Sequence, residues 1–445
     1  MLFKLEKPDL TKISKKQILK LFADNKKAEI FNFLKRIDSD HLYWDKFYYK
    51  EPSPKEITKE ELWMITKILR ESKAIKTIIT DKFRNAFTWS KLDYFEKFFH
   101  KLDMNMGGEL FIEIDKLNKL NKQKMITRGI MEEAIASSQL EGAASSRLAA
   151  KKMLREGKKP TNRSEQMILN NFISMKAIED DYKDRTLSMD MLFELHALIT
   201  QDTTDSEDEK PHLRKTGEPV FVSDESTGVV YFEAPEIDFV KKELTRLINF
   251  ANDESGTRVF IHPIIKAIMI HFWIGYLHPF SDGNGRLARL LFYWYLIKKG
   301  YWAFVYLPIS KIIKRSPKQY IMAYVYSEQD DNDLTYFINY NLNKIKLAAR
   351  EFEEYLAKQS DKNVQMKKRS EAKYALNIRQ VQLLQYLHNA PDERTTQKTH
   401  MNINQISKMT ASNDLKDLLV KGFLSSVKQG RNVFYYGTDK IKDLF

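Results

Sequence analysis

Cysteine is absent from this chain of 445 residues. Disulfide bonds, cysteine-bound zinc sites and thiol catalysis are therefore excluded, and a reducing compartment is compatible with the sequence. There is also no run of about 18 apolar residues, the length that a membrane-spanning helix needs. The first 25 residues carry Lys and Glu throughout and lack the apolar core of a signal peptide. We expect a cytoplasmic protein without membrane contact.

Glycine and proline are scarce, with 15 and 12 residues respectively. Long stretches are rich in Leu, Ile, Met, Lys and Glu, residue types that favour helices. The sequence therefore predicts a mainly α protein, and its length predicts two or three domains. The net charge of +13 suits an acidic partner such as a nucleic acid or a nucleotide. The alternative is a solvated, lysine-rich surface.

Changes of pattern divide the chain into four parts. We expect an N-terminal helical region of unknown role at 1–110, in which the aromatic patch 41–54 forms a loop packed on its neighbours. A larger helical domain follows at 111–357, and the polar, charged segment 358–373 is interpreted as a linker. In 374–445 three helical patterns precede two short strands, the order of elements in a winged helix-turn-helix.

The expected winged helix raises the question of DNA binding. Asn413 and Lys416 of the expected recognition helix are candidate contacts to bases, and Lys428 and Arg431 of the expected wing are candidate contacts to phosphates. Asp414 and Asp417 lie on the same helix and weaken this hypothesis. The alternative is a winged helix used for protein contact or for formation of a homodimer.

Two local signals punctuate the larger helical domain. Ser188 is a good N-cap for a helix at 188–200. At 218–235 the β-branched and aromatic runs VFV and VVYF flank the turn-forming sequence SDESTG, which predicts a β-hairpin.

Residues 278–289 read HPFSDGNGRLAR and combine the densest polar chemistry of the chain with apolar flanks. The apolar helix before them, which begins at Pro263, is expected to be buried. A Gly-Asn-Gly loop then precedes a second apolar helix. Free backbone N–H groups at the N-terminus of a helix favour an anion, and phosphate is the natural one. The common nucleotide-binding loop GxxxxGK[ST] is absent.

The charged side chains of this segment fit a polyphosphate. Arg286 and Arg289 are three residues apart and share a helix face. Asp282 could hold Mg²⁺, with phosphates supplying other ligands. His278 could accept a proton from a hydroxyl. A buried polar turn with locally paired arginines is the weaker alternative.

The segment resembles the signature of the Fic family, HPFx(D/E)GNGRxxR, at every specified position. The resemblance extends over about residues 111–345, with the core at about 188–345. It implies an enzyme that transfers AMP from ATP, with Mg²⁺, to a Ser, Thr or Tyr hydroxyl of a target protein. The resemblance implies that His278 is the general base and that Asp282 holds the metal. It also implies that Gly283, Asn284 and Gly285 form an anion hole for the α- and β-phosphates. Arg286 and Arg289 would bind the β- and γ-phosphates.

The hairpin at 218–235 resembles the flap of this family, which aligns the target beside the active site. Val220, Phe221 and Val222 would then form the strand edge that pairs with the target. Residues 137–142, SSQLEG, resemble the family's inhibitory motif (S/T)xxxE(G/N) through Ser137, Glu141 and Gly142. Without the family context, this motif is an ordinary helix end.

The resemblance implies that Glu141 pairs with Arg289 and removes the partner of the γ-phosphate. The leading hypothesis is thus an auto-inhibited protein adenylyltransferase, which could also remove AMP from its target. The alternative is a DNA-binding transcriptional regulator whose Fic core senses nucleotide. Tyr320 and Tyr324 either line an adenine pocket or pack in the core, and His262 and His271 are expected to be core residues.

Overall fold

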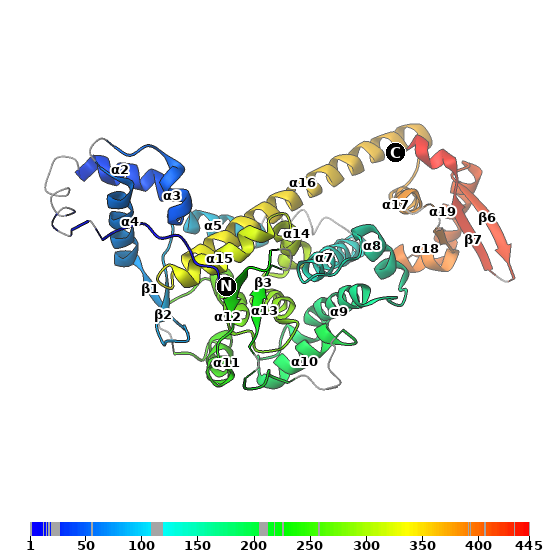
Figure 1. Ribbon diagram of the computed structural model, residues 1–445. Coiled ribbons are helices and arrows are strands. Elements are labelled where there is room, and N and C mark those ends of the chain that lie inside the picture. Colours follow the sequence, from blue (N-terminus) through cyan, green and yellow to red (C-terminus); the bar gives the residue numbers. More distant parts are fainter. Residues whose placement is uncertain are drawn as a thin grey trace. The chain divides into compact units, whose positions relative to one another are not determined.

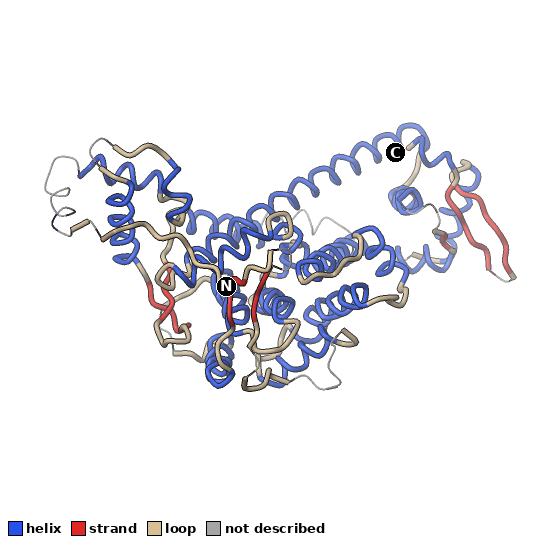
Figure 2. The backbone as a smooth tube through the Cα atoms, viewed as in Figure 1, coloured by secondary structure: helices blue, strands red, loops and turns tan. Residues whose placement is uncertain are grey.

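The computed structural model of the chain describes residues 2–11, 13–14, 16, 18, 27–54, 57–107, 119–203, 212–217, 219–224, 227–256, 259–389, 391, 393–404, 406–430 and 432–444. The chain separates into two units by its internal contacts. Unit 1 comprises Met1–Lys116 and Lys122–Ala349, and unit 2 comprises Leu117–Asn121 and Arg350–Phe445. Helices dominate both units and strands are few and short, which confirms the mainly α fold class (Figures 1 and 2).

The N-terminal part of unit 1 combines helices with a hairpin that the sequence interpretation missed: α2 (Lys27–Ile37), α3 (Trp44–Lys50), α4 (Lys59–Lys73), β1 (Ile75–Thr80), β2 (Ala86–Trp89) and α5 (Tyr94–Gly107). The prediction of a loop at 41–54 is wrong, because this patch contains α3. Trp44 and Phe47 of α3 are buried against Trp63 of α4. Aromatic residues are weak helix formers, so ring packing rather than local propensity explains this helix.

The rest of unit 1 is a helical core: α7 (Lys119–Leu140), α8 (Arg147–Glu156), α9 (Arg163–Ala177), the π-helix η1 (Ile178–Tyr182), α10 (Met189–Thr200), α11 (Ile237–Ala251), α12 (Pro263–Leu277), α13 (Asn284–Lys298), η2 (Trp302–Tyr306), α14 (Ile309–Ile313), α15 (Pro317–Gln329) and the start of α16 (Thr335–Tyr374). The N-cap prediction at α10 is confirmed, since Ser188 Oγ accepts a hydrogen bond from the N–H of Met191. The buried helix is confirmed as well: α12 is apolar all round and packs against α13. The segment 278–289 therefore comprises the connection between these two buried helices and the first turns of α13.

The predicted hairpin at 218–235 is present as β3 (Phe221–Ser223) and β4 (Val230–Glu233), which pair antiparallel. We call this hairpin the flap. The N-terminal segment of the chain reaches the other edge of β4, where Leu2 bridges Val230 and the N–H of Phe3 donates to the Val230 carbonyl at 2.7 Å. Within the described ranges, β3 has no second neighbouring strand.

Unit 2 contains the C-terminal part of α16 and a small α/β arrangement: α17 (Ile378–Asn389), β5 (Arg394–Thr395), α18 (Gln397–Asn404), α19 (Lys408–Val420), β6 (Leu424–Gln429), β7 (Asn432–Gly437) and the 3-10 helix η3 (Asp439–Asp443). The strands are ordered β5-β7-β6. The segment 358–373, interpreted as a linker, is helical and lies within α16. Arg431 of the expected wing lies outside the described residues. None of the helices in the described ranges combines the length and the apolar character needed to cross a bilayer.

Candidate active site

His278 directly follows the buried helix α12 and caps it. Its backbone is left-handed, with φ 45° and ψ 58°, a conformation that is uncommon for a residue with a side chain. Its Nδ1 lies 2.7 Å from the carbonyl oxygen of Gly275. Because a carbonyl only accepts, Nδ1 carries the proton of the neutral ring and Nε2 keeps its lone pair. Burial lowers the pKa of His278, so the ring can act as a neutral base.

Arg214 fixes the backbone around His278, and no sequence motif marked it. Its Nε donates to the His278 carbonyl at 2.9 Å, and its backbone N–H donates to the Pro279 carbonyl at 3.0 Å. Its guanidinium also donates to the carbonyl of Pro235, just after β4 of the flap. One buried arginine therefore joins the backbone at His278 to the base of the flap.

Asn284 closes the loop between His278 and α13. Its Oδ1 accepts from the N–H of Phe280 at 3.0 Å, and its Nδ2 donates to the Phe280 carbonyl at 2.7 Å. The side chain that we expected in the anion hole is thus engaged by the loop. The backbone N–H of Asn284 belongs to the first turn of α13, where N–H groups lack helical acceptors and suit an anion. Gly283, with φ 79°, precedes it as the N-cap.

Helix α10 supports this loop through two residues that the sequence did not single out. His196 stacks on Phe280 with ring centroids 3.7 Å apart, and its Nε2 lies 2.9 Å from the Asp282 carbonyl oxygen. A Cβ on Gly283 would lie 2.9 Å from Cγ2 of Thr200, which is closer than real contacts allow. Glycine at 283 is therefore required both by its φ and by the close approach of α10.

Arg286 is fully buried at the start of α13. It donates to the Ile199 carbonyl at 2.8 Å and to Oδ2 of Asp282 at 3.2 Å. Its Nε has no hydrogen-bond partner among the described atoms. A buried donor without an acceptor is destabilising, and a phosphate oxygen is an acceptor of the right charge.

Arg289 meets the SSQLEG motif from a position 148 residues away from Glu141 in sequence. Its Nε donates to Ser137 Oγ at 2.8 Å, and its guanidinium also donates to the Ser137 carbonyl at 3.0 Å and to Glu141 Oε1 at 2.9 Å. Arg289 is buried, and the Glu141 side chain is 27% exposed. Gly142 follows the end of α7 with φ 90°. The structure thus brings the two motifs into direct contact.

Gly285 accommodates the carboxylate of Glu141. A Cβ at position 285 would lie 2.2 Å from Glu141 Oε1. Glu141 therefore occupies space directly above the first turn of α13, where the backbone N–H groups would bind an anion. Its carboxylate stands where a phosphate is expected.

The flap lies next to His278. The ring centroid of Phe232 on β4 is 6.4 Å from that of His278. The N–H of Ala234 donates to the Val220 carbonyl, and hydrogen-bonded pairs alternate along an antiparallel ladder. The backbone N–H and C=O groups of Val220 and Val222 therefore point toward β4, whereas docking of a target at residues 220–222 stays a prediction. Of the three predicted residues, Phe221 alone presents its backbone N–H and C=O outward, and it is 50% exposed.

Asp282 is the residue expected to hold Mg²⁺. Its Oδ1 accepts from the N–H of Gly283 at 2.6 Å, and its side chain is 41% exposed. No group of three His, Asp or Glu side chains within the described ranges is arranged to hold a metal. Asp282 therefore fits Mg²⁺ as a single carboxylate ligand, with phosphate oxygens and water completing the shell, as is usual for this ion.

Tyr320 and Tyr324 are half-buried and pack against side chains of α12. The Tyr320 hydroxyl is 2.8 Å from Nε2 of His271, and the Tyr324 ring stacks on Phe272. Burial lowers the pKa of His271 to about 3, so this histidine stays neutral. These contacts favour core packing over an adenine pocket.

Comparison with known proteins points to one family. Residues 186–296 match the model of the Fic/DOC family. "Protein adenylyltransferase fic-1" of Caenorhabditis elegans is 35% identical over 95 residues, which are 20% of this chain and 18% of that protein. "Protein adenylyltransferase Fic" of Nematostella vectensis is 27% identical over 213 residues, 45% of this chain and 46% of that protein. The chain therefore spans less than half the length of these curated relatives.

The crystal structure of a Fic family protein from Desulfovibrio desulfuricans G20 covers 77% of this chain and 96% of that chain, with a TM-score of 0.49 and 20% identity. Over part of its length, the chain is thus similar to Fic family proteins.

Proposed function

We propose that the chain is an auto-inhibited protein adenylyltransferase, which transfers AMP from ATP to a Ser, Thr or Tyr hydroxyl of a target protein or of itself. The observation that carries this proposal is the engagement of Arg289 by Ser137 and Glu141, beside a complete HPFSDGNGRLAR loop. The names of the curated relatives support the same activity.

In this proposal His278 accepts the proton of the target hydroxyl at Nε2. The hydroxyl oxygen forms a bond to the α-phosphorus of ATP, and the bond from that phosphorus to the bridging oxygen breaks. Pyrophosphate leaves with the electron pair. The hydrogen bond from Nδ1 to Gly275 and the bonds from Arg214 hold the imidazole and its backbone during this step.

Phosphate binding is assigned to the N-terminus of α13. Backbone N–H groups of residues 283–285 would bind the α- and β-phosphates, and Arg286 and Arg289 would bind the β- and γ-phosphates. Asp282 would hold Mg²⁺, which reduces the negative charge of the phosphates when it is bound. Phe221 would pair its backbone with an extended segment of the target.

Glu141 inhibits transfer in two ways under this proposal. It occupies the guanidinium of Arg289, and it places a negative charge against the first turn of α13. ATP then binds without its γ-phosphate in place. Since Ser137 and Glu141 belong to the same chain as the loop, inhibition acts within one molecule.

Incorporation of AMP from α-labelled ATP with Mg²⁺ tests the proposal, with self-modification as the readout. We expect Glu141→Gly to label at least about tenfold more than wild type, because about 1.4 kcal/mol of lost inhibition suffices. Glu141→Gly/His278→Ala should lose the label. The matched control is Glu254→Gln, which removes an exposed carboxylate elsewhere in unit 1. ATP binding without labelling in Glu141→Gly would reject AMP transfer.

Removal of AMP from a modified target is a second activity that we propose for the same site. Here Glu141 would position the attacking water. The same variant separates the two roles, because Glu141→Gly gains transfer if the residue inhibits and loses hydrolysis if it is catalytic.

A nucleotide-sensing, DNA-binding regulator is the second candidate, and one observation in unit 2 favours it. Asp414 on α19 is buried and accepts hydrogen bonds from Arg379 and Asn377. Asn413 and Lys416 remain exposed. The expected objection from Asp414 to DNA binding is therefore removed. Fluorescence anisotropy with duplex DNA, comparing wild type with Lys416→Ala, tests this alternative. If unit 2 is instead a winged helix that contacts protein, we expect it to join two copies of the chain in a homodimer.

A further inference from the structure

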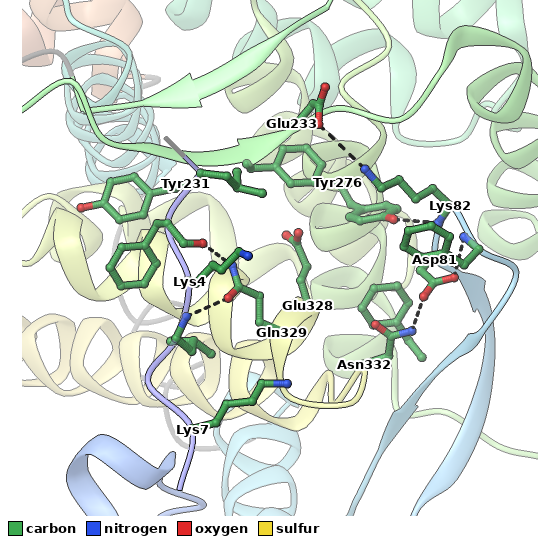
Figure 3. Close-up of a pocket in the computed structure, with 16 residues that line it drawn as sticks. Lys4, Lys7, Asp81, Lys82, Tyr231, Glu233, Tyr276, Glu328, Gln329 and Asn332 are labelled. Atoms are coloured by element: carbon green, nitrogen blue, oxygen red, sulfur yellow. Dashed lines mark hydrogen bonds and ion pairs between the residues drawn. The ribbon is translucent and has the colours of Figure 1, made fainter. Parts of the chain in front are cut away.

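A cavity of about 500 Å³ lies beside the flap within unit 1 (Figure 3). It is bounded by β4, by the N-terminal segment at residues 2–7, by the β1–β2 hairpin, by the end of α12 and by the end of α15. None of the residues assigned to phosphate binding lines it. The cavity is therefore distinct from the nucleotide site.

Glu328 of α15 points into this cavity (Figure 3). Throughout the described part of the chain, no side chain or backbone N–H donates a hydrogen bond to its carboxylate or pairs with it. Lys82, the nearest cation acting on it, lies instead 4.0 Å from Glu233 across the rim. Burial raises the pKa of Glu328 to about 8. A carboxylate in this position is costly to the fold unless it gains a partner.

Aromatic rings form the walls around this carboxylate. Tyr276 contacts both Phe87 and Phe232, with a centroid distance of 5.5 Å to each. Phe83 stands at the rim and is 74% exposed. Aromatic faces attract cations, and the carboxylate of Glu328 adds a negative charge when it is ionised. Three lysines also line the cavity, Lys4, Lys7 and Lys82, but none of them forms an ion pair with Glu328 within the described ranges. A neutral apolar guest would leave Glu328 unpaired.

The cavity adjoins the candidate active site through one side chain. Phe232 lines the cavity, and its ring is also the flap ring next to His278. Tyr276 lines the cavity two residues before His278. The cavity and the position of a hydroxyl at His278 therefore share Phe232 as a common wall.

We propose that this cavity is a subsite for a basic side chain, arginine or lysine, of the target polypeptide, with Glu328 as its charge partner. The inference rests on the proposed function, because the target is defined by AMP transfer. It adds a selection rule to that function: the target carries a basic residue near the modified hydroxyl.

Binding of n-butylguanidinium to the full chain tests the chemistry without any transfer. N-butylurea has the same shape and no charge. We expect n-butylguanidinium to bind at least about tenfold more tightly than N-butylurea, and Glu328→Gln to abolish the difference. Glu254→Gln is the matched control and should keep it. Equal binding of the two probes, or an unchanged preference in Glu328→Gln, would overturn the inference.

Transfer to arrayed peptides tests the biological role in the Glu141→Gly background. Each peptide carries one hydroxyl residue and either arginine or its neutral analogue citrulline at successive positions. We expect labelling to favour arginine about tenfold at one position, and the preference to vanish in Glu141→Gly/Glu328→Gln. Labelling with no preference for arginine rejects the subsite and leaves the proposed function intact. If no peptide and no chain is labelled, the proposed function fails, and the two probes still decide whether the cavity binds cations.

Discussion

Glu141 and Glu328 are two carboxylates of unit 1, carried by different helices, whose surroundings differ. Glu141, at the end of α7, meets Arg289 at 2.9 Å and lies against Gly285. Glu328, near the end of α15, projects into a cavity without a described partner. The first is in an ion pair with Arg289, whereas the second forms no ion pair within the described ranges although lysines line the same cavity. This difference separates a carboxylate held by an internal contact, the proposed inhibitory one, from a carboxylate that can pair with a group from outside.

The comparison also separates two kinds of environment. Around Glu141 the arginines are buried and hydrogen-bonded to backbone carbonyls, so the loop is fixed before any ligand arrives. Around Glu328 aromatic rings stand beside polar and charged side chains that form no described hydrogen bond to it, and the rim is exposed, so a guest can provide the hydrogen bonds. Fixed geometry suits the chemistry that all substrates share, whereas an open cavity suits selection among targets.

The largest effect is expected from loosening the backbone at His278. Arg214→Gln in the Glu141→Gly background should lower kcat by about 100-fold, because a small displacement of a catalytic group has effects of this size. The KM for ATP and the binding of n-butylguanidinium should stay unchanged, since neither site uses Arg214. Steady-state labelling with varied ATP measures this split. Arg214→Lys should restore part of kcat, and a rise in KM without a fall in kcat would contradict the positioning role.

A double-mutant cycle measured on thermal stability tests the contact between Glu141 and Gly285. Gly285→Ala places a methyl group against that carboxylate, which can move aside only by leaving Arg289, and should lower the free energy of unfolding by about 1 kcal/mol, the usual worth of one hydrogen bond. The same substitution in Glu141→Gly should have little effect, because the clash has gone. The midpoint of thermal unfolding measures both shifts. Equal shifts in the two backgrounds would show that the methyl group meets something other than Glu141.

Much of the site could be predicted because the motif is local. Twelve consecutive residues fixed the order of base, carboxylate, glycines and arginines, and the contact of Arg289 with Glu141 followed from matching two motifs. Arg214, His196 and Thr200 escaped prediction, since each acts through single bonds or contacts to a loop distant in sequence. Residues of this kind carry no spacing pattern of their own.

The fold shows the same division. The buried helix α12 and the hairpin of the flap were predicted from periodicity and turn residues. Helix α3 was not, because its aromatic residues favour strands and loops and only their burial against α4 selects a helix. Of the three residues predicted for the docking edge, only Phe221 points its backbone N–H and C=O groups away from β4. This follows from the hydrogen-bond register, which cannot be read from a sequence of alternating apolar residues.

The pH dependence of probe binding sharpens the comparison at Glu328. The carboxyl group is neutral below its raised pKa of about 8 and charged above it. Only the charged form pairs with n-butylguanidinium, so affinity should fall about tenfold from pH 9 to pH 7, in proportion to the ionised fraction. Other titratable groups line the cavity on the N-terminal segment, the β1–β2 hairpin, β4 and α12: Lys4, Lys7, Asp81, Lys82, Tyr231, Glu233 and Tyr276. Titration calorimetry should show no such change in Glu328→Gln; a slope that persists there would assign it to one of these neighbours.

The smallest effect is expected at Ser137, which shares Arg289 with Glu141. Ser137→Ala removes the acceptor at 2.8 Å from Nε but leaves the Ser137 carbonyl and Glu141 in place. Labelling by AMP should therefore rise only about threefold to tenfold, less than in Glu141→Gly. Ser138→Ala is the matched control, because that buried hydroxyl bonds the Met167 carbonyl and does not meet Arg289. Equal gains in the two serine variants would mean that loosening α7, rather than freeing Arg289, releases the enzyme, and Glu141 would then act mainly as an anchor of its helix.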